Sequence, residues 1–239
     1  MSEFTEHLRG NIYLSGGMQH AEGLGAEWRE EVSAELLNMG YYPLDITALD
    51  LAYQEQHGDL FNCGDGDSQS GLLQKKANIR KHFINADLRL INNESDALIV
   101  YYDESARLGA GTISECQVAY NLGLPIFIVN AYDDIDEIPG WLLALSTKVF
   151  DYFFDLYIYL AELPLGILKK DIYGNHNSGN KYLCSLSGEV FDKEGLHFVS
   201  TVSPLYNKES VEVVRAVNEH KDRYEFFVEH IKGKLKNDG

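Results

Sequence analysis

The sequence predicts an α/β fold: a doubly wound parallel sheet followed by a small C-terminal α+β extension. Across residues 10–130, short apolar runs typical of buried strands alternate with amphipathic segments typical of helices. Strands separated by helices form βαβ units, whose strands are parallel and whose crossovers are right-handed. The length of 239 residues suits one sizeable domain with an appendage, so we expect a domain over residues 1–160 and an extension over residues 161–239.

The first two predicted strands flank a helix. Residues 11–15 form an apolar run that ends in Gly16 and Gly17, as in a buried strand that enters a tight turn. Residues 25–39 follow the helical period, with apolar side chains four positions apart on one face and polar ones beside them. Residues 41–44 predict the second strand.

A polar segment interrupts this alternation. Residues 50–72 are rich in glycine and polar side chains, so we expect a long loop that acts as a lid or binding loop. Its aspartates do not complete the spacing of a calcium-binding loop. The alternation then resumes with a helix over residues 75–91, the strongest strand at 97–102, and another strand at 124–129.

The pattern weakens after residue 130. Residues 141–160 are aromatic and apolar, and we expect them to serve as core or as a subunit contact. Residues 182–184 and 197–199 flank a turn and predict a hairpin. Residues 208–236 carry an apolar stripe at helical spacing, which favours a long amphipathic helix for docking or oligomerisation.

Composition excludes several classes of function. With 20 Lys and Arg against 37 Asp and Glu, the net charge is −17, which is unsuited to binding duplex nucleic acid. No run of about 18 apolar residues occurs and the N-terminus lacks a signal peptide pattern, so no membrane contact is expected. Three scattered cysteines indicate reduced thiols in a cytoplasmic protein, and the histidines have no metal-binding spacing.

In a parallel sheet the ligand site lies beyond the carboxyl ends of the strands. The candidate positions there are the turn at residues 16–18, Asp45, residues 103–112 and Asn130.

Residues 109–115 read Gly-Ala-Gly-Thr-Ile-Ser-Glu. Glycines allow close backbone approach to a ligand, Thr112 suits a helix cap, and the N–H groups of a helix start suit an anion. Glu115 is either a favourable partner of the helix dipole or a nucleophile aimed into the cleft. A carboxylate nucleophile at an anomeric carbon forms a glycosyl ester through an oxocarbenium-like transition state.

An ordered set of motifs resembles the nucleoside 2-deoxyribosyltransferase family over residues 10–150. The set comprises Asn-Ile-Tyr-Leu-Ser-Gly-Gly-Met at 11–18, Asn-Ala-Asp at 85–87, Asp-Ala-Leu-Ile-Val at 96–100, Gly-Thr-Ile-Ser-Glu at 111–115 with Ala119, and Asn-Leu-Gly-Leu-Pro at 121–125. The resemblance implies a flavodoxin-like, Rossmann-like fold and a homo-oligomer whose subunits share the site. It also implies cleavage of a nucleoside's N-glycosidic bond, without a cofactor.

The resemblance also implies roles for individual residues. Glu115 corresponds to the family's catalytic glutamate, the nucleophile. Asp87 corresponds to the aspartate that handles the nucleobase or its proton; the alternative is a solvated helix residue. Tyr13 corresponds to an aromatic residue that positions the nucleophile through a hydroxyl hydrogen bond; the alternative is a buried strand tyrosine. The other candidate substrate contacts are Gly16, Gly17, Met18, Asp45, Asp103, Arg107, Gly109, Gly111, Thr112 and Lys148.

The sequence departs from the family pattern near the sugar. The family carries an Asp shortly before the nucleophile for the sugar 5′-hydroxyl, but Gly109 stands six residues before Glu115, and the nearest Asp, Asp103, stands twelve before it. Near Thr147 and Lys148 the family has an Asn from a neighbouring subunit. Arg107 and Lys148 favour a phosphate, so we hypothesise that a nucleoside 5′-monophosphate is also a substrate. The alternative for Arg107 is a solvated loop residue.

The function predicted from these motifs is cleavage or transfer of the N-glycosidic bond of a (deoxy)nucleoside or its 5′-monophosphate. Three alternatives remain. One is a phosphoribohydrolase of the lysine-decarboxylase-like type, whose G-G-x-G-T-x-x-E motif residues 109–115 partly match, although the preceding Pro-Gly-Gly is missing. The second is a non-catalytic nucleotide-binding module. The third is a structural protein assembled through the aromatic segment and the last helix.

Overall fold

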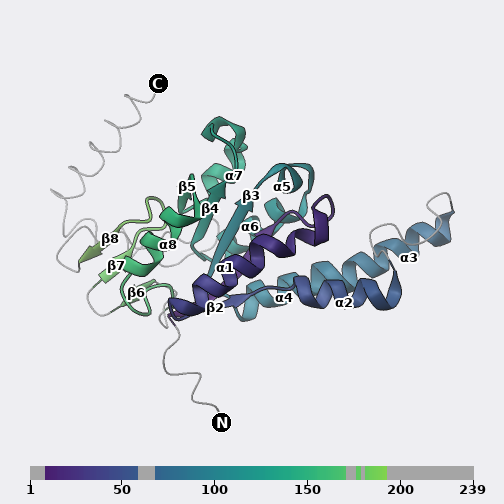
Figure 1. Ribbon diagram of the computed structural model, residues 1–239, viewed down its shortest axis with the longest axis horizontal. Coiled ribbons are helices and arrows are strands. Elements are labelled where there is room, and N and C mark those ends of the chain that lie inside the picture. Colours follow the sequence, from purple (N-terminus) through teal and green to yellow (C-terminus); the bar gives the residue numbers. More distant parts are fainter. Residues whose placement is uncertain (1–8, 59–67, 171–175, 179–180, 193–239) are drawn as a thin grey trace, which may run out of the picture.

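The computed structural model describes residues 9–58, 68–170, 176–178 and 181–192. At its centre is a five-stranded parallel sheet in the order β2-β1-β3-β4-β5 (Figure 1). This flavodoxin-like order confirms the predicted doubly wound α/β fold. The strands are β1 (Gly10–Gly16), β2 (Tyr41–Leu44), β3 (Ala97–Tyr102), β4 (Ile126–Asn130) and β5 (Lys148–Phe150).

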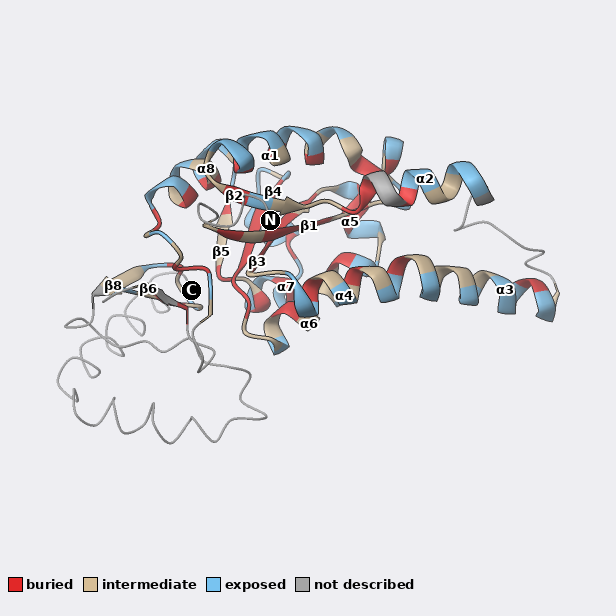
Figure 2. Ribbon diagram, turned by 90° about the horizontal axis from the view of Figure 1, so that it is seen from below, coloured by how far each residue is buried: buried red, intermediate tan, exposed pale blue. Residues whose placement is uncertain are grey.

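Helices cover both faces of the sheet (Figure 2). On one face lie α1 (Ala26–Asn38) and α8 (Phe153–Glu162), and on the other lie α4 (Asn85–Asn93), α6 (Gly111–Asn121) and α7 (Gly140–Leu145). Each strand supplies both apolar cores, because successive side chains of a strand point to opposite faces. The shorter helical segments are η2 (Glu22–Gly25), α5 (Glu104–Leu108) and η4 (Ile135–Glu137).

Strand β1 shows how this alternation prepares a site. Ile12 and Leu14 are buried in the core under α1 and α8, whereas Tyr13 belongs to the core under α4 and α6. The connection after β1 passes through α1 on one face, and the connection after β3 passes through α6 on the other. The topological switch point therefore lies between β1 and β3, where such folds bind ligands.

The prediction of a loop over residues 50–72 is wrong at both ends of that range. Residues 50–57 belong to α2 (Thr47–His57), and α3 (Gln69–Ile79) starts before the predicted loop ends. No glycine or proline interrupts α2, so its polar residues form a helix with an exposed outer face. Residues 59–67 lie outside the described part of the chain.

The predicted helix over residues 75–91 is confirmed and is longer than expected. It comprises α3, a π-helical segment η3 (Arg80–Ile84) and α4. In Figure 1, α2 and α3 extend away from the sheet, while α4 remains against it. The sequence also gave no sign of α5, which Asp103 caps by accepting a hydrogen bond from the Ala106 N–H at 2.8 Å.

The C-terminal part contains a small antiparallel sheet of β6 (Asn177–Ser178), β7 (Lys181–Leu183) and β8 (Val190–Asp192). The predicted strand at 182–184 is present, but its partner is β8; the predicted partner at 197–199 and the predicted helix at 208–236 lie outside the described residues. Leu163, Leu168 and Leu183 pack into the same core as β1 and α1. The predicted division at residue 160 falls within α8 and stays a prediction.

Three further observations concern membrane-spanning helices, the cysteines and the exposed apolar side chains. Within the described ranges, no helix is both long and apolar enough to cross a membrane. Cys116 and Cys184 are free and buried. Large apolar side chains are exposed on α7 and on or near α8: Trp141, Tyr152, Phe154, Ile158 and Leu165. The homo-oligomer stays a prediction.

Candidate active site at the switch point between β1 and β3

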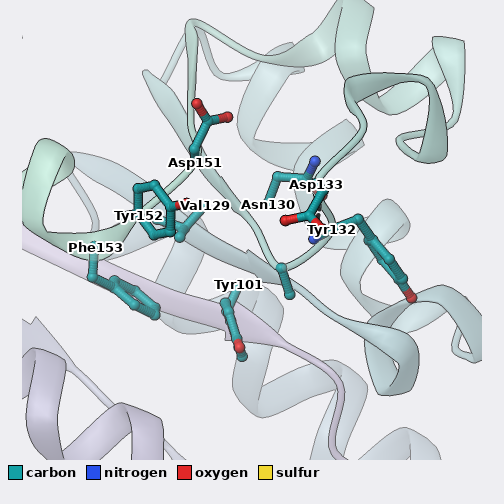
Figure 3. A pocket seen from close by; sticks show the side chains of 9 residues that line it. Tyr101, Val129, Asn130, Tyr132, Asp133, Asp151, Tyr152 and Phe153 are labelled. Atoms are coloured by element: carbon teal, nitrogen blue, oxygen red, sulfur yellow. Dashed lines mark hydrogen bonds between the residues drawn. The ribbon is translucent and has the colours of Figure 1, made fainter.

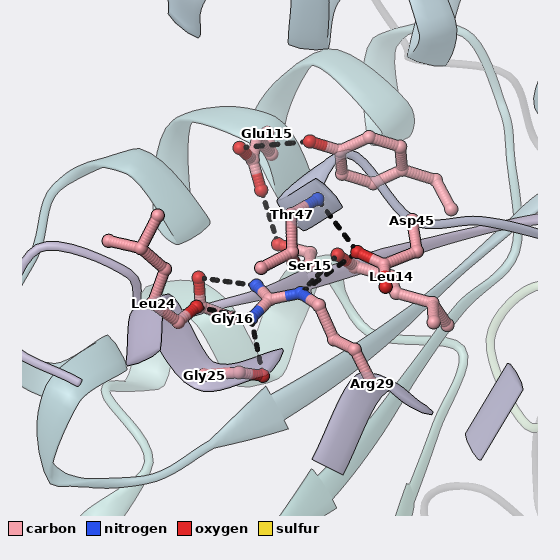
Figure 4. A network of polar contacts seen from close by, with 10 residues as sticks. Leu14, Ser15, Gly16, Leu24, Gly25, Arg29, Asp45, Thr47 and Glu115 are labelled. Carbon is pink, nitrogen blue, oxygen red and sulfur yellow. Dashed lines mark hydrogen bonds and ion pairs between the residues drawn. The ribbon is translucent and has the colours of Figure 1, made fainter. Parts of the chain in front are cut away.

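Glu115 meets two hydroxyl groups of strand β1. Tyr13 and Ser15 are two residues apart, so both side chains point to the face that α6 covers. The Tyr13 hydroxyl donates to Glu115 Oε1 at 3.4 Å, and the Ser15 hydroxyl donates to Glu115 Oε2 (Figure 4). Glu115 lies one residue past the first turn of α6. Strand and helix together fix the orientation of this carboxylate.

Two opposing influences act on the Glu115 carboxyl. Burial raises its pKa above the ordinary value. Hydrogen bonds from Ser15 and Tyr13, together with the positive charge of Arg29, oppose this shift because they stabilise the ionised form. Each carboxylate oxygen thus has a donor, so a negative charge is more stable on Glu115 than on a buried carboxyl without such donors.

Asp87 is the second carboxyl of the site. It lies in the first turn of α4 and is 9% exposed, and within the described ranges its Oδ1 atom has no hydrogen-bond partner. Burial raises the pKa of Asp87 to about 8, and the charges of Glu115 and Asp50 add to the increase. Tyr13 and Arg29 oppose it only partly. Near neutral pH this environment holds a proton on Asp87.

Glu115 and Asp87 differ in the donors that surround them. The two groups interact and titrate as a pair, so a shared proton belongs to the carboxyl with fewer donors. Glu115 has two hydroxyl donors, whereas Asp87 keeps an unpaired oxygen. A carboxylate beside a carboxylic acid is the arrangement that supplies a nucleophile and a general acid at one pH.

Arg29 is a buried cation that the helical pattern had placed among the polar residues beside the apolar face. It is 1% exposed. Its Nη1 donates to the carbonyls of Leu24 (3.0 Å) and Gly25 (3.1 Å), and its Nη2 donates to that of Gly16 (3.1 Å) (Figure 4). Its Nε lies 3.4 Å from the Leu14 carbonyl and 4.0 Å from Asp45 Oδ1. Arg29 therefore ties the end of β1 to the turn before α1.

The glycines at the end of β1 have packing roles. A side chain at Gly17 would overlap Ser105 and the backbone of Ala106, at the start of α5. A Cβ at Gly16 would lie 2.8 Å from the Trp28 ring. These glycines let β1 end against α5 and α1, and Met18, which follows them, is half-buried.

The segment before Glu115 is open. A Cβ at Gly111 would meet no atom within 4 Å, and a Cβ at Gly109 would only reach ordinary contact distance. Thr112 does not cap α6 as expected: the N-cap residue is Ala110, without a side-chain bond, and Thr112 is buried inside the first turn. The open space beside Gly111 lies next to the start of the helix that carries Glu115.

Arg107 and Lys148, the two cations expected to bind a phosphate, contact other groups in the structure. Arg107 is exposed and pairs with Glu104, with Nε 2.8 Å from Oε2, and lies 3.9 Å from Glu137. Lys148 begins β5 beside Phe127, toward the amino ends of the strands, with Nζ 4.5 Å from the centre of the Tyr159 ring. Thr147 is buried and accepts a bond from the Ile126 N–H at 3.0 Å. The structure does not bring Lys148 to the carboxyl edge.

A separate cavity of about 320 Å³ lies at the carboxyl ends of β3, β4 and β5 (Figure 3). Asn130, at the end of β4, is a buried polar residue of this cavity; its Nδ2 donates to the Asp134 carbonyl at 3.1 Å, and its Oδ1 accepts from the Tyr132 N–H at 3.3 Å. Neither Tyr13, Asp87 nor Glu115 lines it. The lining residues are Tyr101, Val129, Asn130, Ala131, Tyr132, Asp133, Asp151, Tyr152 and Phe153.

Sequence reasoning missed three residues of the site: Ser15, Arg29 and Asp50. Ser15 had a usable signal, because it stands two positions after Tyr13 in the same strand and therefore on the same face. Asp50 was hidden in the predicted loop.

Within the ranges that the structure describes, no group of three His, Cys, Asp or Glu side chains is arranged to hold a metal ion.

No family model matches the chain, and no curated protein matches it. Among solved structures, the chain is similar to a 2-deoxyribosyltransferase from the psychrotolerant bacterium Bacillus psychrosaccharolyticus, with a TM-score of 0.40 and 14% sequence identity. The alignment covers 66% of this chain and 95% of that one. A likeness at this level says nothing about the reaction, which has to be inferred from the side chains at the switch point.

Proposed function

We propose that this chain cleaves the N-glycosidic bond of a nucleoside through a glycosyl ester on Glu115. The observation that carries the proposal is the pair of unlike carboxyls at the switch point: Glu115, held by two hydroxyl donors, and Asp87, buried with an unpaired oxygen. The nucleoside as substrate rests on the motif resemblance described above.

The proposed first step needs both carboxyls. A Glu115 oxygen attacks C1′ of the sugar while the bond from C1′ to the base nitrogen breaks, through an oxocarbenium-like transition state. The electron pair of that bond goes to the base, which takes the proton of Asp87. The products are a free base, a glycosyl ester on Glu115 and an ionised Asp87.

The second step resolves the ester. A second base or a water molecule attacks C1′ from the face that the first base left, and its proton passes to Asp87. The Glu115 carboxylate is released and regains the bonds from Ser15 and Tyr13. Transfer and hydrolysis share the first step, and two inversions at C1′ give net retention of configuration.

The electrostatics favour a neutral nucleoside over its 5′-monophosphate. Asp45, Asp50, Asp87 and Glu115 all act on the site, and the donors of Arg29 are committed to backbone carbonyls. A phosphate carries up to two negative charges and needs cationic or N–H donors. Arg107 is already paired with Glu104. We therefore propose the nucleoside as the preferred substrate.

The test is turnover of the purified full chain with a panel of ribo- and deoxynucleosides and their 5′-monophosphates, with and without a second base, followed by chromatography. We expect base release or exchange from nucleosides, and a loss of about 10³-fold or more in Glu115→Gln, because an amide does not form the ester. Intact mass of the protein with a slowly resolved 2′-fluoro substrate checks for the adduct. Glu162→Gln, an exposed acid on α8, is the matched control.

Each contrary result has a distinct meaning. Unchanged turnover in Glu115→Gln overturns Glu115 as nucleophile. Turnover of monophosphates alone overturns the preference for neutral substrates and favours the phosphoribohydrolase type. Ligand-induced thermal shifts in a wild-type protein without turnover favour the non-catalytic binding module.

A further inference from the structure

Asp50 is a third buried acid beside the proposed catalytic pair. It lies in the first turn of α2, its exposed fraction is 0%, and neither of its carboxyl oxygens has a hydrogen-bond partner in the part of the chain that the structure describes. An unpaired buried carboxyl is costly, and a position that keeps one calls for an explanation. The reaction proposed above does not use Asp50.

The charged groups around Asp50 come from several elements and are mostly acidic. Two of its acidic neighbours, Glu115 and Asp87, form the catalytic pair, and a third, Asp45, precedes α2. Among the described residues, the positive charge that opposes the effect of these acids on Asp50 is that of Arg29, whose donors bind backbone carbonyls. One turn further along the same face of α2, the ring of Tyr53 meets that of His82 of η3 edge-on, with ring centres 4.5 Å apart, so this face of α2 lies against the segment that leads into α4.

Asp50 changes its charge in the pH range in which Asp87 must remain an acid. Burial raises the pKa of Asp50 to about 7, Asp45 and Glu115 add to the increase, and Arg29 opposes it. Asp50 in turn contributes to the raised pKa of Asp87. As pH rises, Asp50 ionises first, and its charge then disfavours a second negative charge nearby.

We propose that Asp50 is a positioning residue for the proton of Asp87. Its buried, unpaired carboxylate opposes ionisation of Asp87 and so keeps that residue a general acid on the alkaline side of neutrality. Asp50 itself forms and breaks no bond: the proton that Asp87 gives to the leaving base returns from the incoming base or water. This inference rests on the proposed function of Glu115 and Asp87.

The sharpest variant is Asp50→Asn, which resembles the neutral acid in shape. We expect kcat/KM to equal that of the wild type near pH 6, where Asp50 is protonated, and to fall below it above pH 7. The alkaline limb of the profile should move down by about one pH unit, which gives up to about a tenfold loss at pH 9. Glu55→Gln removes one charge from the exposed face of the same helix and should leave the profile unchanged.

A second measurement is independent of turnover and of any variant. Carboxyl ¹³C chemical shifts of Asp87 in the wild-type protein, followed from pH 5 to 10, should show a step at the titration of Asp50 before the main step of Asp87. An Asp87 titration in a single step, unaffected by Asp50, overturns the inference. So does an Asp50→Asn profile that is lowered by one factor at every pH, which is what a merely structural role predicts. Absence of turnover in the wild type would instead count against the proposed function, and the titration would still test Asp50.

Discussion

Two regions at the carboxyl edge of the sheet differ in how their polar groups are satisfied. In the cavity beyond β3, β4 and β5, the Asn130 amide both donates and accepts a hydrogen bond within its own loop, and the Tyr132 hydroxyl donates to Glu104 at 2.9 Å. At the switch point between β1 and β3, Asp50 and Asp87 are buried with oxygens that have no hydrogen-bond partner among the described residues. The buried amide of the cavity thus has partners on both its nitrogen and its oxygen, whereas the buried acids of the switch point keep unpaired oxygens.

This difference locates the chemistry better than the size of a hollow does. Satisfied polar groups around an open cavity cost the fold little and need no functional explanation. Unpaired buried carboxyls destabilise the folded state, and such costs are found where an active site needs perturbed acids. The switch point, with its raised pKa values, is therefore the region in which substitutions should affect turnover most.

The largest effect that separates the two regions is expected for Asp87→Asn. Asparagine keeps the shape but has no acidic proton, so kcat should fall by about 10²- to 10³-fold. The loss should be smaller for nucleosides whose base leaves readily without a proton. Asp151→Asn, at the rim of the cavity, removes one exposed acid and should leave kcat within about twofold of the wild type. Steady-state kinetics on two substrates with unlike leaving bases would check both.

A result with the two variants reversed would move the chemistry to the cavity. Equal losses for good and poor leaving bases in Asp87→Asn would contradict its role as the acid, because only proton donation makes the loss depend on the base.

The next largest effect is on stability rather than turnover. Asp50, Asp87 and Glu115 all have raised pKa values in the folded state. Between about pH 4 and pH 8 the folded protein thus binds more protons at these groups than the unfolded chain does, so their contribution to the free energy of unfolding falls as pH rises. We expect a loss of about 2 kcal/mol between pH 5 and pH 8 and a flatter dependence in Asp50→Asn. Urea denaturation at fixed ionic strength measures both slopes.

The exposed variant Glu55→Gln should keep the wild-type slope. A wild-type protein whose stability rises steadily from pH 5 to pH 8 would show that these three carboxyls ionise without cost, and it would remove the contrast between the two regions.

The parallel sheet was predictable because its strands are nearly continuous apolar runs between amphipathic helices. Gly16 and Gly17 marked the correct end of β1, and the position of Glu115 at the start of a helix followed from the same pattern. These signals are local, so one sequence is enough to find them. Asp87 and Tyr13 entered through the motif resemblance rather than through the pattern.

The rest of the site depends on contacts that local patterns do not contain. Asp50 lies in a run of polar residues that has the composition of a loop, and only the packing of α2 shows that one of its acids is inward. Arg29 has the spacing of a polar residue beside an apolar face, yet the carbonyls of β1 and of the turn before α1 surround it. Both cases are polar side chains buried by tertiary contacts, which override the expectation from sequence.

The smallest effect concerns Ser15, the residue that alternation along β1 could have identified. Ser15→Ala removes one of the two donors to Glu115, and alanine leaves that oxygen unpaired. Because the lost bond favoured the ionised form, the pKa of Glu115 should rise and the acid limb of kcat/KM should move to higher pH, with the loss, up to about tenfold, greatest on the acid side of the profile. The loss should shrink as pH rises, because Glu115 then ionises without the donor.

Tyr13→Phe removes the longer bond, 3.4 Å, and should shift the same limb less. A loss in Ser15→Ala that is the same at every pH would mean that the hydroxyl only orients the nucleophile, and an unchanged profile would mean that the contact between β1 and α6 contributes nothing to its ionisation.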